Sequence, residues 1–455
     1  MAMFRFSCIA FLGALLVAPL AGQDAPEPES EARLAPLRRQ AEQGDLHAAQ
    51  QLYMRYAVAG NLEEARAWAA RYNELLADRA EAGDAKAMLQ LGSRYLNGGD
   101  YTPQSIEKAV TWFTRASEAG EPTAAYVLGV VFAKQGNVPI STQAYERAYS
   151  LYSQRLESAP DDAETLYWLG FMQQNGIGVA RDVPAGIARL EQAAARGSAW
   201  AASQLFKTYT NGVGVPRDEA KAFAYARQLA DEKQDGMMAY VVASALIFGR
   251  GVAQDAPLGE RYLDQAVQAN IPDAIYMKAT RLEAAGKQAE ATPLLRQADS
   301  MLQPDAVVRY GLMLLHGAEG VAQDEPRGLA RLEAAANRFQ SPQAAWELAR
   351  YYDANDEKDL ADSWYVVASN RGVAQAMARR GLLHLLPGPY VSWSPTETYR
   401  WWRAGKEAGD PLCSLYINLF LYVFTPLLLL LVFGVPAWLG HRARKRLQQD
   451  ANEAP

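Results

Sequence analysis

A five-residue element of the form Gly-Val-x-x-Asp recurs along this chain at nearly constant spacing. It occupies residues 178–182, 214–218, 251–255 and 320–324. The first three copies are separated by 36 and 37 residues, and the fourth follows after 69, close to twice that period. Self-similarity at a period of about 20–50 residues is the signature of stacked supersecondary units, each of which buries its apolar face only against its neighbours. The chain is therefore predicted to fold as one long array.

Each unit is predicted to consist of two helices joined by this glycine-rich turn. Glycine adopts a positive φ without steric cost, and the Asp that ends each copy can accept the free N–H groups of the second helix as an N-cap. Pro184, Pro257 and Pro326 follow in the first turn of that helix, where a missing N–H does no harm. We interpret the repeated positions as structural, not catalytic: Gly178, Asp182, Gly214, Asp218, Gly251, Asp255, Gly320 and Asp324.

Tryptophans form a second repeated pattern near the predicted helix ends. Trp112, Trp364 and Trp401 each stand eight residues before a glycine. Large aromatic side chains at such positions usually fill the core between helices, so we expect core wedges here and not a platform for a ligand.

Together these positions give the pattern L-G-x-x-[YF]…G-x-G-V-x-x-D…A-x-x-W-x-x-x-A-x-x-G over about 36 residues. The pattern resembles the Sel-one-like repeat, a relative of the tetratricopeptide repeat, and the resemblance covers roughly residues 40 to 410. It implies an all-α, right-handed solenoid of stacked helix-turn-helix repeats. Members of this family are adaptors with many different partners, so the resemblance is specific for fold and says little about function.

Two stretches of the array, 271–302 and 343–372, lack the glycine-rich turn and are shorter than their neighbours. A shortened unit is expected to change the superhelix locally, because curvature arises from a small rotation repeated at each unit. We expect 271–302 to form two ordered helices and to create a concave pocket for a partner. The alternative is a degenerate spacer that binds nothing.

Composition excludes several classes of function. The net charge of −6 and a pI near 5.5 provide no basic footprint for nucleic acid. Four scattered histidines and two cysteines, Cys8 and Cys413, form neither a metal-ligand pattern nor a disulfide framework. No phosphate-binding loop, zinc-protease motif or nucleophile elbow is present. We therefore expect no catalytic residues, no cofactor and no enzymatic activity.

The two ends of the chain indicate export. Residues 1–22 carry Arg5, an apolar run and small residues, the layout of a secretory signal peptide, with an uncleaved anchor as the alternative. Residues 23–34 are acidic and contain proline, which predicts a disordered linker before the array at 35–410.

The C-terminal end is predicted to cross a membrane. Residues 413–440 contain no charged side chain, and about 20 apolar residues are enough for a helix to span a bilayer. A basic cluster begins at His441, so the tail 441–455 is expected to stay in the cytoplasm and the array to lie on the opposite side. An unusually long buried core helix is the alternative.

This topology gives several hypotheses for function. The first is a membrane-anchored periplasmic scaffold of a bacterial inner membrane, which binds protein partners on the concave face of the solenoid. The family that the chain resembles includes scaffolds of exopolysaccharide (alginate-like) synthesis and export, and a role in such a complex is the most specific form of this hypothesis. The second is a periplasmic regulator of a membrane sensor kinase. A luminal adaptor in ER-associated degradation shares the topology, but the chain has no N-x-[ST] glycosylation sequon and its composition favours bacteria.

Overall fold

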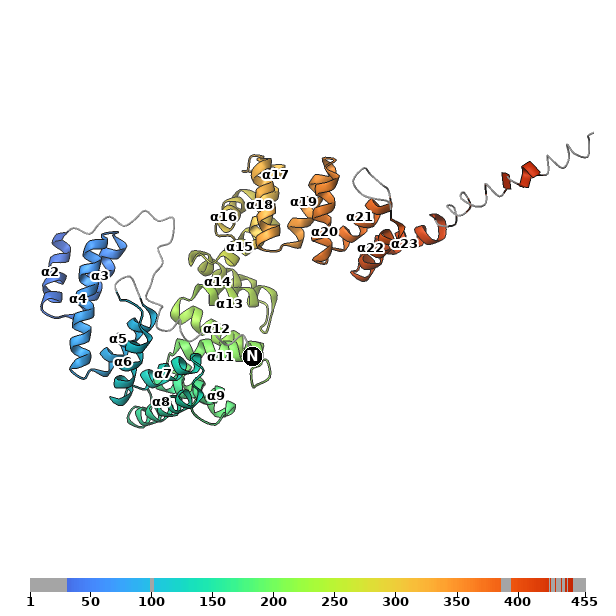
Figure 1. The fold of residues 1–455 in the computed structure, drawn as a ribbon. Coiled ribbons are helices and arrows are strands. Elements are labelled where there is room, and N and C mark those ends of the chain that lie inside the picture. Colours follow the sequence, from blue (N-terminus) through green and yellow to red (C-terminus); the bar gives the residue numbers. More distant parts are fainter. Residues whose placement is uncertain are drawn as a thin grey trace, which may run out of the picture. The chain divides into compact units, whose positions relative to one another are not determined.

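The computed structural model describes residues 31–98, 102–385 and 394–424, together with scattered positions from 426 to 444 (Figure 1). Over these residues the chain is helical, and it contains isolated β-bridges such as Ala318–Val321 but no β-strand. The chain divides into two compact units, and each is described by itself.

Unit 1 comprises residues 1–233 and 250–252. Its helices are α2 (Glu31–Glu42), α3 (Leu46–Val58), α4 (Leu62–Glu81), α5 (Ala85–Asn97), α6 (Ile106–Glu118), α7 (Pro122–Lys134), α8 (Val138–Ser158), α9 (Ala163–Asn175), α10 (Val183–Ala195), α11 (Ala199–Asn211) and α12 (Glu219–Lys233).

Unit 2 comprises residues 234–249 and 253–455. Its helices are α13 (Gly236–Phe248), α14 (Ala256–Gln268), α15 (Pro272–Ala284), α16 (Gln288–Ser300), α17 (Pro304–His316), α18 (Glu325–Arg338), α19 (Pro342–Ala354), α20 (Lys358–Asn370), α21 (Ala374–Leu385), α22 (Pro395–Glu407) and α23 (Pro411–Leu419), followed by a π-helical turn, η1 (Phe420–Phe424).

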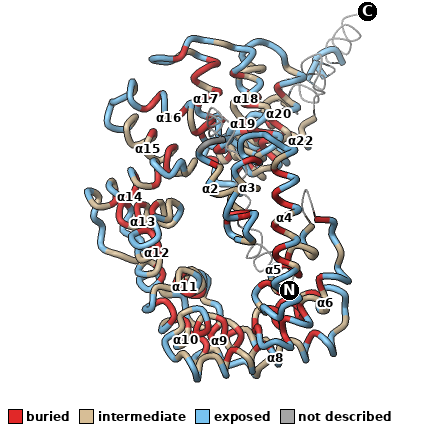
Figure 2. The backbone as a smooth tube through the Cα atoms, turned by 90° about the vertical axis from the view of Figure 1, so that its left-hand side faces the viewer, coloured by how far each residue is buried: buried red, intermediate tan, exposed pale blue. Residues whose placement is uncertain are grey.

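Consecutive helices pack as pairs, and small residues allow the two backbones of a pair to meet. In α9–α10, a Cβ added to Gly186 would lie 2.6 Å from the backbone nitrogen of Gln174 and 2.8 Å from the carbonyl oxygen of Gly170. In α17–α18, a Cβ on Gly328 would lie 2.7 Å from the nitrogen of Leu315. Figure 2 shows buried positions recurring along the helices of each unit, as in α9 and α10. This packing explains why small residues recur at one register of the repeat.

The aromatic core wedges lie one residue after the tryptophans that the sequence pattern singled out. Trp112, Trp364 and Trp401 are only partly buried. The residues that follow them, Phe113, Tyr365 and Trp402, are 0%, 2% and 2% exposed. The eight-residue spacing to the glycine locates the two adjacent aromatics, but it does not determine which of them faces the partner helix. Trp112 and Trp364 pack against the hydrophobic cores from half-buried positions, and the fully buried wedge lies one residue later.

The wedge aromatics reach the small residues of the first helix in a pair. A Cβ on Gly92 would lie 2.7 Å from the ring of Phe113, and one on Gly381 would overlap the indole of Trp402. Trp401 instead lies beside two cations, with the guanidinium carbon of Arg380 4.1 Å from the centroid of its ring system and that of Arg400 5.7 Å away. The half-buried tryptophan therefore contacts charged side chains at the helix surface.

The N-terminal linker is shorter than expected. Helix α2 begins at Glu31, inside the predicted disordered stretch 23–34. Leu34 is 3% exposed and belongs to the hydrophobic core of unit 1, with Leu37 packed against that core. Burial of these leucines supplies the free energy that orders the last residues of the predicted linker. Residues 1–22 and the first part of the linker lie outside the described residues.

The predicted membrane span, 413–440, is described only in part. Helix α23 and η1 cover its beginning, and most positions from 425 to 440 lie outside the described residues, as does the tail from residue 445. Among the helices that are described, none is both long and apolar enough to cross a membrane.

Candidate functional site

Each of the four Asp residues in the Gly-Val-x-x-Asp turns caps the helix that follows it. The carboxylate of Asp182 accepts the backbone N–H of Ala185 at 3.0 Å, and that of Asp255 accepts the N–H of Leu258 at 3.0 Å. Asp218 and Asp324 accept the N–H groups of Lys221 and Arg327 at 2.9 and 3.2 Å. These bonds satisfy donors that a helix N-terminus otherwise leaves open. The carboxylates are therefore occupied by backbone groups.

The backbone of the same Asp closes the turn from its other side. The N–H of Asp182 donates to the carbonyl of Gln173 at 2.9 Å, and the N–H of Asp324 donates to the carbonyl of Leu314 at 2.8 Å. The N–H of Ser105 makes the equivalent bond to Tyr95 at 2.8 Å, and its hydroxyl caps α6. Ser105 therefore occupies the position that Asp holds elsewhere, which the search for a Gly-Val-x-x-Asp motif missed.

A second interaction missed at the sequence level involves the residue directly before the Asp. Arg181 Nε donates to the carbonyl of Gln174 at 3.1 Å, and Gln254 Nε2 donates to that of Ile247 at 2.8 Å. Gln323 Nε2 donates to the carbonyl at the end of α17 at 3.0 Å. The signal is present in the sequence, because each of these positions holds a long side chain with an N–H donor. Arg217 departs from the pattern and pairs with Glu219 at 2.5 Å.

The turn glycines allow the turn to pack on a preceding helix. Gly178 has a φ of +66°, and a Cβ there would overlap the backbone carbonyl of Tyr145 in α8. Gly251 has a φ of +69°, and a Cβ there would meet Glu219 at the start of α12. The repeated Gly and Asp positions are therefore committed to local structure and are not gathered into one site.

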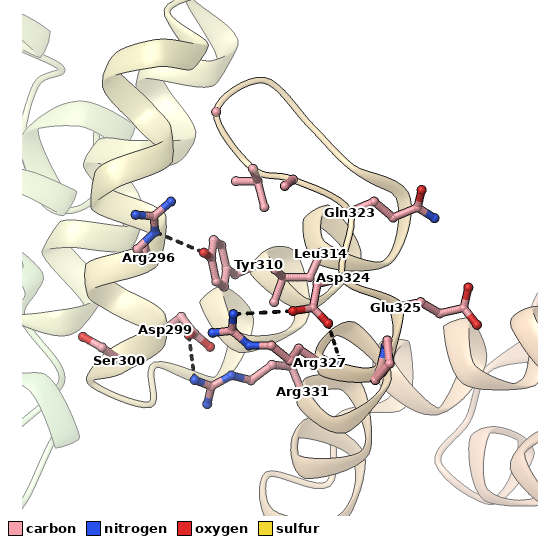
Figure 3. Close-up of a pocket in the computed structure, with 14 residues that line it drawn as sticks. Arg296, Asp299, Ser300, Tyr310, Leu314, Gln323, Asp324, Glu325, Arg327 and Arg331 are labelled. Atoms are coloured by element: carbon pink, nitrogen blue, oxygen red, sulfur yellow. Dashed lines mark hydrogen bonds and ion pairs between the residues drawn. The ribbon is translucent and has the colours of Figure 1, made fainter.

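The structure forms a cavity at one of these turns, between α16, α17, α18 and the loop 317–324 (Figure 3). Its volume is about 760 Å³, within the range of ligand pockets. The apolar part of the lining includes Leu314 and Val321, and the Tyr310 ring is also buried. The charged residues that line it are Arg296, Asp299, Asp324, Glu325, Arg327 and Arg331.

A buried carboxylate lies in this lining. Asp299 is 2% exposed, and its Oδ2 pairs with the guanidinium of Arg331 at 3.2 Å. Its Oδ1 is buried and has no hydrogen-bond partner among the described residues. Burial raises the pKa of the Asp299 carboxyl, against the opposing charges of Arg331 and Arg327. A buried carboxylate oxygen without a hydrogen bond lowers the stability of the folded state, and the Asp299 carboxylate carries this cost in the lining of the cavity.

The two other arginines are less tightly held. Arg296 donates from Nε to the hydroxyl of Tyr310 at 3.0 Å, and its charge lies 5.9 Å from that ring. Arg327 reaches the carboxylate of Asp324 only at 3.5 Å, and 71% of its side chain is exposed. Glu325 is bound from outside the cavity by the hydroxyl of Tyr351. The cavity therefore presents guanidinium groups whose hydrogen-bond donors are only partly used.

The position of this cavity agrees in part with the sequence-level expectation of a pocket at 271–302. Arg296 and Asp299 come from that stretch, whereas Tyr310, Arg327 and Arg331 come from the following, regular unit. No motif links these residues, since they lie on three helices, so sequence reasoning missed the arginines. Among the described residues, no group of three or more His, Cys, Asp or Glu side chains could hold a metal ion.

Fold and turn geometry together define an α-solenoid of helix-turn-helix repeats. The family model described as Sel1 repeat matches six segments, residues 85–121, 163–198, 201–233, 237–271, 304–338 and 374–410. The chain therefore contains six Sel1 repeats. The matched segments are the pairs joined by the longer turns, and the pairs joined by the short turns 59–61, 135–137, 285–287 and 355–357 fall outside them.

One solved structure agrees with this fold. The chain is 25% identical to a protective antigen present in uropathogenic Escherichia coli strains that displays an SLR fold. The match covers 86% of this chain and 82% of that one, with a TM-score of 0.59. A Sel1 repeat protein from Oxalobacter formigenes is 22% identical over 90% of this chain and 99% of its own, with a TM-score of 0.34.

Proposed function

We propose that this protein is a non-enzymatic scaffold that binds other proteins. Sel1 repeats generally mediate protein–protein interactions, and scaffolds built from them are typically non-catalytic. The observation that carries the proposal is the use of the repeated polar residues, whose carboxylates cap helices and whose backbone groups close turns. The repeat positions then serve to build a surface, and the surface is what a partner recognises.

We further propose that the scaffold is anchored in a bacterial inner membrane, with the array in the periplasm. The support is the leader at residues 1–22, the uncharged stretch 413–440 and the basic tail 441–455. An exopolysaccharide synthesis or export complex is the assembly that we propose for it. Regulation of a membrane sensor kinase is the second candidate.

Reporter fusions test the topology. A reporter that is active only in the cytoplasm should be active when it is fused after Pro455 and inactive when it is fused at Asp410. A reporter that is active only in the periplasm should give the opposite pattern. If both positions report the same compartment, the proposed membrane anchor is wrong.

Photo-crosslinking tests the scaffold itself. Crosslinking amino acids are placed one at a time at exposed positions from Asp273 to Gln297 and, separately, in the block 162–269. Crosslinks from either region to one defined envelope protein are expected. The identity of that protein separates an exopolysaccharide complex from a sensor kinase. Absence of any protein crosslink from both regions would contradict the scaffold.

A further inference from the structure

We propose that the cavity between α16, α17 and α18 binds an acidic side chain carried by a peptide segment of the partner. This inference rests on the proposed protein-binding function and assigns it a site and a chemistry. The cavity is built entirely within unit 2.

The arginines of the lining supply the charge that such a side chain needs. A guanidinium has five N–H donors in a fixed fork, which matches the two oxygens of a carboxylate. Arg296 donates from Nε to the hydroxyl of Tyr310, and it has no ion pair among the described residues. Its terminal nitrogens therefore remain available to a carboxylate that enters the cavity.

The acidic residues of the lining do not neutralise Arg296. Asp299 is paired with Arg331, and Asp324 caps α18 and faces Arg327. Glu325 is engaged by the hydroxyl of Tyr351 (Figure 3 shows the lining residues). Asp299 and Asp324 thus each have a cationic partner, Glu325 is bound by a neutral hydroxyl, and Arg296 on α16 is the lining arginine without a carboxylate partner among the described residues. An anionic ligand is favoured at that position.

The remaining lining favours a polypeptide over a free ion. A volume of about 760 Å³ far exceeds the space that one carboxylate needs. Leu314 and Val321 add apolar surface. Ser300 and Gln323 already donate to backbone carbonyls of the protein, and their side-chain oxygens can accept an N–H from a peptide backbone. An acidic side chain can reach Arg296 while its own backbone and neighbouring side chains fill the rest of the cavity.

Charge reversal at Arg296 gives a sharp test. Peptides that bind the full-length protein are selected from a phage-displayed library of short random sequences. The selected peptides are labelled with a fluorophore, and their binding is measured by fluorescence anisotropy. The selected peptides should share an Asp or Glu, and Arg296→Glu should weaken their binding about tenfold or more, the loss typical of a charge-assisted hydrogen bond. Replacing the shared acidic residue by Lys should restore binding to Arg296→Glu.

A matched variant controls for general charge effects. Arg350→Glu reverses an exposed arginine on α19 in the same unit, 59% of whose side chain is accessible, and should leave peptide binding unchanged. Thermal unfolding of Arg296→Glu should remain close to that of the wild type, because Arg296 is exposed. Peptides without a shared acidic residue, or equal loss in both variants, would overturn the proposal.

Two further probes separate other sources of negative charge. Polygalacturonate presents carboxylates on a polysaccharide, and inorganic phosphate presents a free anion. If either binds in an Arg296-dependent way while no peptide does, the cavity is not a peptide site and the proposal fails. If the wild-type photo-crosslinks to the partner persist in Arg296→Glu, the scaffold function stands and only the assignment of this cavity is lost.

Discussion

The helix pairs α17–α18 and α19–α20 follow one another in unit 2, and different interactions stabilise the turn between the two helices of each pair. The first has the long turn 317–324, in which Asp324 caps α18 and Gln323 bonds the end of α17. The second has the short turn 355–357, and Glu357 at the N-cap of α20 makes no side-chain cap bond. The same contrast separates Asp255 before α14 from Lys287 before α16.

The short-turn pair is held by charged side chains that come from further along the chain. Asp353, at the end of α19, accepts hydrogen bonds from Lys358 at 2.9 Å, from the Tyr365 hydroxyl at 3.0 Å and from Arg379 at 2.8 Å. Lys358 also donates to the backbone carbonyl of Asp353 at 2.8 Å. The turn 317–324 thus satisfies its helix ends locally, whereas the helix ends at the turn 355–357 are held by an ion cluster that only the packed structure assembles. Short turns can also carry a cap, since Asn61 and Asn137 accept the backbone N–H groups of Glu64 and Ile140.

The largest expected effect is removal of that cluster. Asp353→Asn should lower the free energy of unfolding of unit 2 by roughly 2–3 kcal/mol, since a buried carboxylate loses two cationic partners that are themselves partly solvated. Urea unfolding followed by circular dichroism measures it. Asp356→Asn is the control, because 91% of its side chain is exposed. An equal loss in both variants would break the comparison.

The same cluster should make the stability of unit 2 depend on pH. Burial alone would raise the pKa of Asp353, but hydrogen bonds from Lys358 and Arg379 outweigh it and hold the pKa below the ordinary 3.8. Its stabilising contribution is therefore present above pH 3.8 and is lost as the pH falls through the lower pKa of the folded state. The difference in unfolding free energy between the wild type and Asp353→Asn should shrink below pH 3.8. A constant difference across that range would show that the charge is not responsible.

Close backbone contact in the long-turn pairs gives the next effect. Gly186→Ala should destabilise unit 1 by about 1–3 kcal/mol, because its Cβ would enter the backbone of α9. Helix propensity alone predicts the opposite sign, a gain of up to about 1 kcal/mol. The sign of the shift in thermal unfolding therefore decides whether contact or propensity dominates.

The capping difference predicts a smaller effect. Asp255→Ala should cost about 0.5–2 kcal/mol, because the N–H of Leu258 loses its acceptor. Lys287→Ala, at the N-cap of the short-turn helix α16, should be close to neutral, because its side chain makes no cap bond. Chemical denaturation of the two variants in parallel tests the contrast. Partner binding should survive in Asp255→Ala at temperatures where it stays folded, and loss of binding without a change in melting would assign this residue a direct function.

The smallest effect concerns the residue before the capping Asp. Gln254→Ala should lower stability by about 0.5–1.5 kcal/mol, since the carbonyl of Ile247 loses a hydrogen bond. Gln254→Arg should be tolerated, because Arg181 makes the same kind of bond in the α9–α10 turn. If Gln254→Arg is as destabilising as Gln254→Ala, the proposed equivalence of these side chains is wrong.

The recurrence of glycine and aspartate determined the architecture from sequence alone, because a turn that needs positive φ and an N-cap specifies both helices around it. The repeated Gly-Val-x-x-Asp element predicts the helix pairs, and the absence of a glycine-rich turn at 271–302 and 343–372 predicts two of the short-turn pairs, α15–α16 and α19–α20. These are local signals, read within a few residues of the chain. They depend on backbone conformation, which a side chain restricts at its own position.

Only the tertiary structure decided which side chains meet across helices. The choice of Phe113 over Trp112 as a core wedge depends on the rotation of one helix against another, which adjacent aromatics leave open. The cluster at Asp353 and the cavity at Arg296 join residues from different helices, so no spacing in the sequence predicts them. Contacts of this kind arise because stacked units bury surface against their neighbours, and the order of stacking is a property of the fold.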